Sequence, residues 1–227
     1  MDTAHGRFDE LRTGFTAAVS HELRTPLARI LALLDSAELP GADVHALIDQ
    51  ARVEIEDAGA LIDEILFLSE LESGKEVVSL GHTAAVPVLE DVIAGLDGPA
   101  SRAGIELAVE GDPSVDVPLR PRMLRIIAEN LAENAIRYAG HGARFVFSVV
   151  RSGDFVVLTA ADDGVGVSAP ALARLFERFY RADAARTTRG TGLGLAIVKH
   201  IVVAAGGDID ADGGPDRGLR IRATFPG

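Results

Sequence analysis

Two long stretches with a helical spacing of apolar residues constrain the fold of this chain more than any other feature. In the first stretch, apolar side chains recur every three or four positions from Phe8 to Leu34. In the second, a seven-residue repeat runs from Val44 to Ile65. Pro40-Gly41 separates the two, so we predict one helix over about residues 6–39 and a second from residue 43 to about residue 73.

The seven-residue repeat predicts the seam of a helix bundle. Its members are apolar or small and alternate between spacings of four and three: Val44, Ile48, Ala51, Ile55, Ala58, Ile62 and Ile65. Leu47, Leu61 and Leu68 make the stripe too wide for one partner helix to cover. We therefore predict a homodimer in which two hairpins form a four-helix bundle, with Asp43 as N-cap of the second helix. A monomeric hairpin packed on the rest of the chain is the alternative.

One histidine lies on the polar side of the first helix, beside a carboxylate. His21 is two residues from the apolar positions on either side, or about 200° at roughly 100° per residue, so its imidazole should point into water. Pro26 cannot donate to the carbonyl of Glu22, which should bend or loosen the helix just after His21. A zinc site of the H-E-x-x-H type is excluded because Thr25 stands where the second histidine would be. By itself, His21 is compatible with an ordinary solvated histidine.

Composition and charge exclude several classes of function. Hydrophobic residues make up 48% of the 227, enough for a core, and the absence of cysteine excludes disulfides, thiolate metal sites and cysteine nucleophiles. No apolar run reaches the roughly 18 residues of a membrane span, and no signal-peptide pattern is present. We therefore expect a cytoplasmic chain with no membrane contact of its own. Residues 1–80 hold 16 acidic and 6 basic side chains within a net charge of −12, so nucleic acid is not an expected partner.

The second part of the chain mixes helices and strands. Helices are predicted at about 86–93, 121–138 and 192–205, and strands at 105–109, 144–150, 155–161, 208–211 and 219–225. Helices kept apart from mostly antiparallel strands predict an α+β two-layer sandwich. The resulting domain plan is a helical hairpin over residues 1–75, a linker over 76–82, and the sandwich over 83–227.

Two groups of polar residues in the predicted sandwich suit a nucleotide and its metal. Asn130 and Asn134 lie one helical turn apart, and a carboxamide oxygen is a ligand that Mg²⁺ accepts. Asp162 follows a strand directly and can accept a hydrogen bond from an exocyclic amine such as that of adenine. Gly164 and Gly166 would let the backbone approach a flat ligand closely. Each pattern alone is also compatible with a helix surface or a plain turn.

A glycine-rich stretch leads straight into the last predicted helix. Its residues are Gly190, Thr191, Gly192, Leu193 and Gly194, and free N–H groups at a helix start can hold phosphate. The stretch matches neither the P-loop nor the dinucleotide fingerprint. Residues 168–191 before it contain five arginines and two acids, a locally positive segment suited to closing over a polyphosphate.

Taken in order, these motifs resemble those of the catalytic core of bacterial two-component sensor histidine kinases. The stretch around His21 is similar to the phosphoacceptor box. The N, G1, F and G2 boxes follow at suitable spacing over nearly the whole chain, at residues 130–138, 162–166, 176–181 and 190–195. The resemblance implies a dimerisation and phosphotransfer hairpin joined to an ATP-binding domain of the gyrase and mismatch-repair ATPase superfamily. That domain would have the Bergerat-type fold, a mixed sheet with helices on one face.

The resemblance also implies roles for individual residues. His21 would be the phosphoacceptor, Glu22 its acidic partner and Thr25 the group that orients water for hydrolysis of the partner's phospho-aspartate. Asn134 would bind Mg²⁺, with Asn130 as its companion, and Asp162 would read adenine. The remaining ATP-binding residues would be Arg137, Tyr138, Gly164, Gly166, Arg181, Gly190, Thr191, Gly192, Leu193 and Gly194.

The function implied is Mg-ATP-dependent phosphorylation of His21, followed by transfer to an aspartate of a response-regulator receiver domain. A catalytically silent ATP-binding module that signals by conformation is the alternative. An ATP-hydrolysing machine is disfavoured because Asn130 occupies the position where hydrolysing relatives carry a glutamate base. The chain begins only twenty residues before His21, so we expect the core of a membrane-anchored sensor or a kinase whose input lies elsewhere. Gly218-Leu219-Arg220 replaces a more usual Gly-Thr pair, with little expected effect.

Overall fold

The computed structural model describes the backbone of residues 2–73, 81–182 and 190–227, and the side chains of these ranges except residues 2–17 and 72. The chain divides into two compact units, residues 1–67 and 68–227. The boundary between them falls inside the second helix, and most of the predicted linker over 76–82 lies outside the described residues. The linker therefore remains a prediction.

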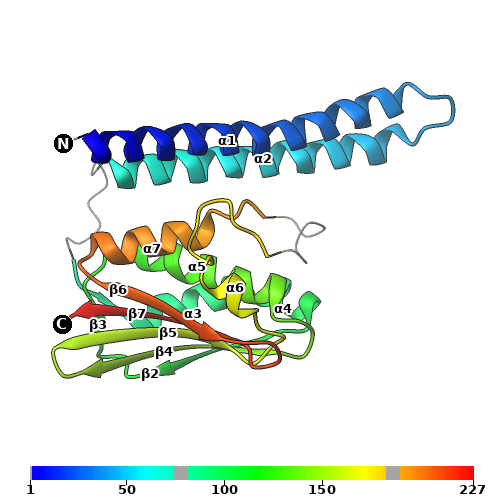
Figure 1. Cartoon of the computed structure of the whole chain (residues 1–227). Helices are drawn as coiled ribbons and strands as arrows, with labels where there is room; N and C mark the ends of the chain where they lie inside the picture. Colours follow the sequence, from blue (N-terminus) through cyan, green and yellow to red (C-terminus); the bar gives the residue numbers. More distant parts are fainter. Residues whose placement is uncertain (1, 74–80, 183–189) are drawn as a thin grey trace. The chain divides into compact units, whose positions relative to one another are not determined.

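The first unit is a helical hairpin, as predicted (Figure 1). Helix α1 spans Asp2–Ala37 and α2 spans Val44–Glu72. Gly41 supplies the left-handed backbone of the connection, with φ of 82°. Asp43 caps α2 as predicted, because its Oδ1 accepts the N–H of Ala46 at 3.1 Å. The helical backbone of α1 continues through Pro26.

Within one chain the seven-residue repeat of α2 is only partly covered, in keeping with the prediction that a single partner helix cannot cover the whole stripe. Ala51 is buried, but Ile48, Ile55 and Ile62 are 50%, 58% and 44% exposed. Leu61, which the sequence placed at the margin of the stripe, is only 4% exposed. The covering helix selects which face is buried, and spacing alone cannot show where that helix lies.

A polar pair joins the two helices of the hairpin. Glu54 of α2 is buried, and its carboxylate lies 3.5 Å from the guanidinium of Arg29 in α1. Glu54 sits three residues after Ala51 and seven before Leu61, on the same inward face. A buried carboxylate paired at one position favours one register of two helices over its neighbours.

The second unit is a two-layer sandwich. Its elements in chain order are β1 (Thr83–Ala84), α3 (Ala85–Gly95), α4 (Asp97–Ala103), β2 (Glu106–Gly111), β3 (Asp116–Val117), α5 (Pro121–Tyr138), β4 (Arg144–Ser152), β5 (Phe155–Asp162), α6 (Ala169–Leu172), α7 (Gly194–Ala204), β6 (Asp208–Gly213) and β7 (Leu219–Pro226). The five-stranded sheet has the order β2-β4-β5-β7-β6, and β1 pairs with β3 separately. Helices α3, α5 and α7 cover one face of the large sheet (Figure 1).

The sheet is mixed, as predicted. Strands β4 and β5 form the predicted hairpin, with Ser152 opposite Phe155, and β7 adds to β5 in antiparallel register from Phe155 opposite Pro226. Strand β2 pairs with β4 in parallel, which needs a crossover connection, and helix α5 lies in that connection. The strict alternation of buried residues along β4 and β5 leaves one face of each strand for the helices.

The core between the helices and the sheet is shielded from solvent. Fully buried side chains come from the sheet, such as Phe147, Leu158 and Phe225, and from the helices, such as Leu124 and Ile201. Pro121 begins α5 at its first turn, where a missing N–H costs nothing. The short elements β1, β3, α4 and α6 were not predicted, because two to seven residues are too few to show periodicity.

Candidate functional site

The His21 side chain is exposed on α1, as the helical spacing predicts. Glu22 beside it is half-buried, and the hydroxyl of Thr25 lies 3.4 Å from the His21 carbonyl, toward which it donates. A shallow hollow of about 460 Å³ lies along this part of the hairpin, lined by His21, Arg24, Thr25, Ala28, Arg29 and Ala32. The imidazole is therefore open to a large partner.

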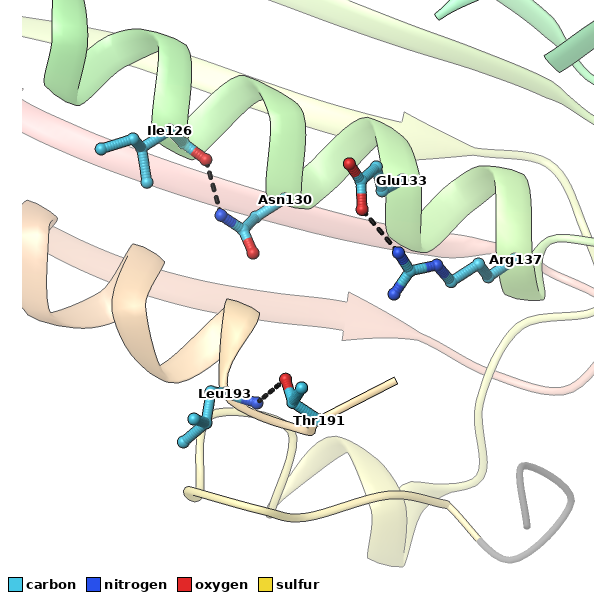
Figure 2. A network of polar contacts seen from close by, with 6 residues as sticks. All are labelled: Ile126, Asn130, Glu133, Arg137, Thr191 and Leu193. Atoms are coloured by element: carbon cyan, nitrogen blue, oxygen red, sulfur yellow. Dashed lines mark hydrogen bonds and ion pairs between the residues drawn. The ribbon is translucent and has the colours of Figure 1, made fainter. Parts of the chain in front are cut away.

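In the second unit, the two predicted asparagines differ in their surroundings. The Asn130 side chain donates from Nδ2 to the carbonyl of Ile126 at 2.8 Å (Figure 2). Asn134 is half-buried and makes no side-chain hydrogen bond to any residue in the described part of the chain. Arg137 pairs with Glu133 at 2.6 Å on the same helix. The oxygen of Asn134 is thus available to a ligand, whereas the amide group of Asn130 is already used within the protein.

Asp162 stands at the end of β5 with its carboxylate held by the backbone. Its Oδ1 accepts the N–H of Gly164 at 2.9 Å and the N–H of Leu219 at 3.3 Å. Burial raises the pKa of Asp162 above its ordinary value, and those two hydrogen bonds counteract part of the rise. The contact with Leu219 was missed from the sequence because a backbone donor carries no residue signature.

The glycines after Asp162 are needed where they pack. A Cβ on Gly164 would collide with the carbonyl of Ala139 at the end of α5. A Cβ on Gly166 would collide with the carbonyl of Gly214 between β6 and β7, and Gly166 has φ of 66°. Both glycines therefore bring this loop against neighbouring backbone, and their role as shapers of the Asp162 pocket stays a prediction.

The glycine stretch before α7 is packed against α5. A Cβ on Gly190 would lie 3.1 Å from the Tyr138 hydroxyl and 3.5 Å from Arg137 Nη1. A Cβ on Gly194 would collide with Asn130 Oδ1. The structure thus brings Asn130, Arg137 and Tyr138 to this stretch.

Helix α7 begins at Gly194, two residues later than predicted, because Gly192 has φ of 72°. The N-cap Leu193 makes no side-chain cap, and its own N–H donates to Thr191 Oγ1 at 3.2 Å (Figure 2). The first N–H groups of a helix have no intrahelical acceptor. The start of α7 therefore presents donors and the positive end of a helix dipole, as a phosphate site requires.

The arginine-rich segment is described only in part, since residues 183–189 lie outside the described ranges. Arg181 is half-buried and follows Tyr180, whose ring lies under the guanidinium of Arg174 at 4.3 Å. Phe179 donates its N–H to the Gly192 carbonyl at 2.9 Å. The sequence placed Phe179 in the F-box motif without predicting this contact, and did not single out Arg174, because both contacts depend on the path of the loop. The predicted closure of this segment over polyphosphate stays a prediction.

Two family models match the chain at the two groups of candidate residues. Residues 11–74 match the His Kinase A (phospho-acceptor) domain, and residues 120–227 match the histidine kinase-, DNA gyrase B-, and HSP90-like ATPase family. Together they contain every residue predicted for the site.

Whole-chain comparisons agree with the family models. The sensor-like histidine kinase SenX3 of Mycobacterium tuberculosis strain H37Rv is 31% identical over 98% of this chain and 55% of its own length. The structure of full-length ShkA in complex with AMPPNP is 28% identical, covers 92% of this chain and 45% of that one, and has a TM-score of 0.68. The histidine kinase ThkA, solved with the response regulator TrrA, is 19% identical and covers 99% of this chain and 64% of that one, with a TM-score of 0.75.

These matches define a class of protein in which a phosphoacceptor hairpin is followed by an ATP-binding domain. The chain belongs to the two-component histidine kinases and carries the two domains of their catalytic core. It spans about half the length of SenX3. None of the described helices is both long enough and apolar enough to cross a membrane.

Proposed function

We propose that this chain transfers the γ-phosphoryl group of Mg-ATP to His21 and then to an aspartate on a response-regulator receiver domain. The observation that carries the proposal is an exposed histidine beside a carboxylate in a phosphoacceptor hairpin, in one chain with a glycine-lined helix start suited to phosphate. The ThkA structure with TrrA supports a partner of this class.

At His21, one ring nitrogen forms a bond to the γ-phosphorus while the bond from that phosphorus to the bridging oxygen breaks, and ADP leaves with the electron pair. Glu22 accepts the proton from the other ring nitrogen. A neutral imidazole is the nucleophile, and a neighbouring carboxylate selects its tautomer. In the second step, a receiver carboxylate takes the phosphoryl group as the nitrogen–phosphorus bond breaks.

In the ATP-binding domain, Asp162 accepts a hydrogen bond from the adenine amine, and the donors at the start of α7 hold the phosphates. Arg137, Tyr138 and Arg181 would lie at the phosphate end. The donor set suits Mg²⁺, because the oxygen of Asn134 is half-buried and makes no side-chain hydrogen bond within the described residues. Bound there, the ion would neutralise charge on the phosphates.

Asn130 supports transfer to histidine over hydrolysis of ATP. An amide cannot act as a general base, and its Nδ2 already donates to Ile126. The site therefore lacks a base at the position from which hydrolysing relatives activate water. This favours the kinase over an ATP-hydrolysing machine.

We also propose a homodimer through the hairpin. Apolar side chains remain exposed on both helices, with Leu27, Leu31 and Leu34 of α1 at 58%, 61% and 55%, and Ile55 of α2 at 58%. A contiguous apolar stripe of this kind marks an interaction surface. A second hairpin of the same sequence would complete a four-helix bundle. With its relatives named sensors, the chain is proposed to be the cytoplasmic core of a membrane-anchored sensor.

The test is incubation with γ-labelled ATP and Mg²⁺, followed by acid and alkali treatment of the protein. The expected result is acid-labile, alkali-stable label that is absent from His21→Gln and retained in His45→Gln. His45 is the matched control, since it is also an exposed histidine of the hairpin. Label in His21→Gln equal to the parent overturns the proposal. ATP binding without label indicates the silent module, and steady phosphate release indicates an ATPase.

Thr25 is proposed to orient the water that hydrolyses the phosphorylated receiver domain. Thr25→Ala should lose phosphatase activity and keep autophosphorylation within about threefold, because the hydroxyl does not touch the transferred group in the first reaction. Ser36→Ala is the control, since the Ser36 hydroxyl donates to the carbonyl four residues back, at 2.7 Å, in the same helix. Unchanged phosphatase activity in Thr25→Ala would reject this role.

A further inference from the structure

Phe179 holds a backbone conformation that aromatic residues avoid. Its φ is 58°, in the left-handed region where the Cβ of an L-residue crowds its own backbone. Such a residue persists only where surrounding contacts fix it. The contacts around Phe179 should therefore indicate the role of this backbone conformation.

Phe179 makes a backbone contact with the middle glycine of the phosphate-binding stretch. The Phe179 N–H donates to the Gly192 carbonyl at 2.9 Å. A Cβ on Gly192 would lie 2.8 and 2.9 Å from the carbonyl carbon and Cα of Phe179, and 3.0 Å from the Tyr180 carbonyl oxygen. Gly192 is itself left-handed, with φ of 72°. We call this pairing of two left-handed residues the 179–192 clasp.

The residues around Phe179 are held independently of the clasp. Arg174 lies over the Tyr180 ring at 4.3 Å and pairs with Glu177 at 2.9 Å. Lys199 of α7 lies 5.8 Å from the centroid of the Phe176 ring. The aromatic segment, residues 174–181, thus has side-chain contacts of its own and one contact with α7 besides the clasp.

The clasp also sets the orientation of the backbone around Gly192 and Leu193. The Gly192 carbonyl is taken by Phe179, and the Leu193 N–H is taken by Thr191 Oγ1 at 3.2 Å. A carbonyl directed at a polyphosphate would repel it, so holding this one against the aromatic segment leaves the helix-start donors as the groups that face the anion.

We propose that Phe179 is a positioning residue for ATP: its strained backbone, through the Gly192 carbonyl, fixes the phosphate-binding stretch in its binding geometry. The inference rests on the proposed function, since it assigns a role in binding that nucleotide. It places the role in the backbone of Phe179 and requires no contact of Phe179 with ATP.

The first test compares Gly192→Ala with Gly153→Ala. Gly153 in the β4–β5 turn also has positive φ, at 59°, but no atom lies within 4 Å of its added Cβ. Both variants carry similar backbone strain, and only Gly192→Ala opens the clasp. We expect the KM for ATP to rise about tenfold or more in Gly192→Ala, with a smaller change in kcat, and to stay within about twofold in Gly153→Ala. Equal KM values in the two variants overturn the proposal.

A second pair of variants separates the contribution of the Phe179 backbone from that of its aromatic ring. Phe179→Pro removes the donor and forces φ to about −65°, whereas Phe179→Gly keeps the N–H and accepts positive φ. Nucleotide affinity, measured by titration with ATP, should fall in the proline variant as in Gly192→Ala and stay within about threefold in the glycine variant. An equal loss in both would assign the effect to the ring and overturn the proposal.

Hydrogen exchange at the Phe179 amide supplies a readout besides binding. The amide should be protected in the parent and exposed in Gly192→Ala. If the parent itself takes up no ATP, the proposed function fails. If the parent binds ATP and Gly192→Ala binds it equally well, only the clasp fails.

Discussion

The hairpin and the sandwich bury their apolar residues in different ways. In the sandwich, sheet and helices enclose a core in which Phe147 and Phe225 are fully buried. In the hairpin, isoleucines of a regular repeat remain about half exposed. The sandwich therefore buries its core within one chain, whereas the hairpin exposes an apolar surface that the proposed dimer would cover.

The same contrast holds for the functional residues. The proposed phosphoacceptor of the hairpin, His21, is one exposed side chain on a helix. In the sandwich, the candidate residues combine side chains of α5 and β5 with glycines of the two loops that pack against α5 and against the β6–β7 turn. Substitutions in the two units should therefore fail in different ways, and the following predictions run from the largest expected effect to the smallest.

Asp162→Asn should weaken ATP binding by about a hundredfold or more, because a buried hydrogen-bonding partner of the base is changed. It should also raise the melting temperature near pH 7. Burial raises the pKa of Asp162 in the folded state, so its ionised form opposes folding, and that cost appears as pH rises from the ordinary aspartate value of about 3.9 through the raised one.

The melting-temperature gain of Asp162→Asn over the parent should therefore shrink as the pH falls from 7 through the raised folded-state pKa, and should be absent below about 4. Asp163→Asn is the control, since Asp163 is the adjacent carboxylate and accepts the backbone N–H of Arg144 at 2.6 Å. Titration calorimetry and thermal scans at several pH values measure both effects. A gain that grows on acidification would contradict the expected sign.

Ile55→Asp should weaken the proposed dimer by a factor of about 30 or more, since a central apolar residue of an interface contributes on the order of 2 kcal/mol. The helix itself should persist, because Ile55 is 58% exposed in the single chain. Analytical ultracentrifugation and circular dichroism measure the two properties. Gln50→Asp, a change at an exposed polar position of the same helix, should leave the dimer intact. A parent chain that sediments as a monomer would contradict the proposed dimer.

Two glycine-to-alanine changes sharpen the comparison directly. Gly164→Ala should cost about 1–3 kcal/mol of unfolding free energy, because its Cβ meets the Ala139 carbonyl. Gly59→Ala, inside α2 with no atom within 4 Å of the added Cβ, should stabilise the chain by roughly 0.5–1 kcal/mol. Denaturant titration checks both, and destabilisation by Gly59→Ala would place that glycine in a packed interface.

Much of the site could be predicted from the sequence, for a definite reason. His21 was placed on the exposed side of its helix from spacing alone, since helix geometry fixes the angle between neighbours. Asn134, Asp162 and the glycine stretch were selected as candidates because local motifs combine with strands and helices of readable periodicity. The contacts among them could not be predicted: that Asn130 meets Gly194, or that Phe179 meets Gly192, depends on how separate elements pack.

The sequence by itself determined the order of the two domains, the candidate reactive residues and the protein family, because helical periodicity and motif spacing are local properties. Only the tertiary structure decided which stripe of α2 is buried, that the Leu219 N–H holds Asp162, and that each glycine before α7 meets a different neighbour. Those outcomes depend on contacts between residues far apart in the chain, whose free energies are settled only when the elements pack together.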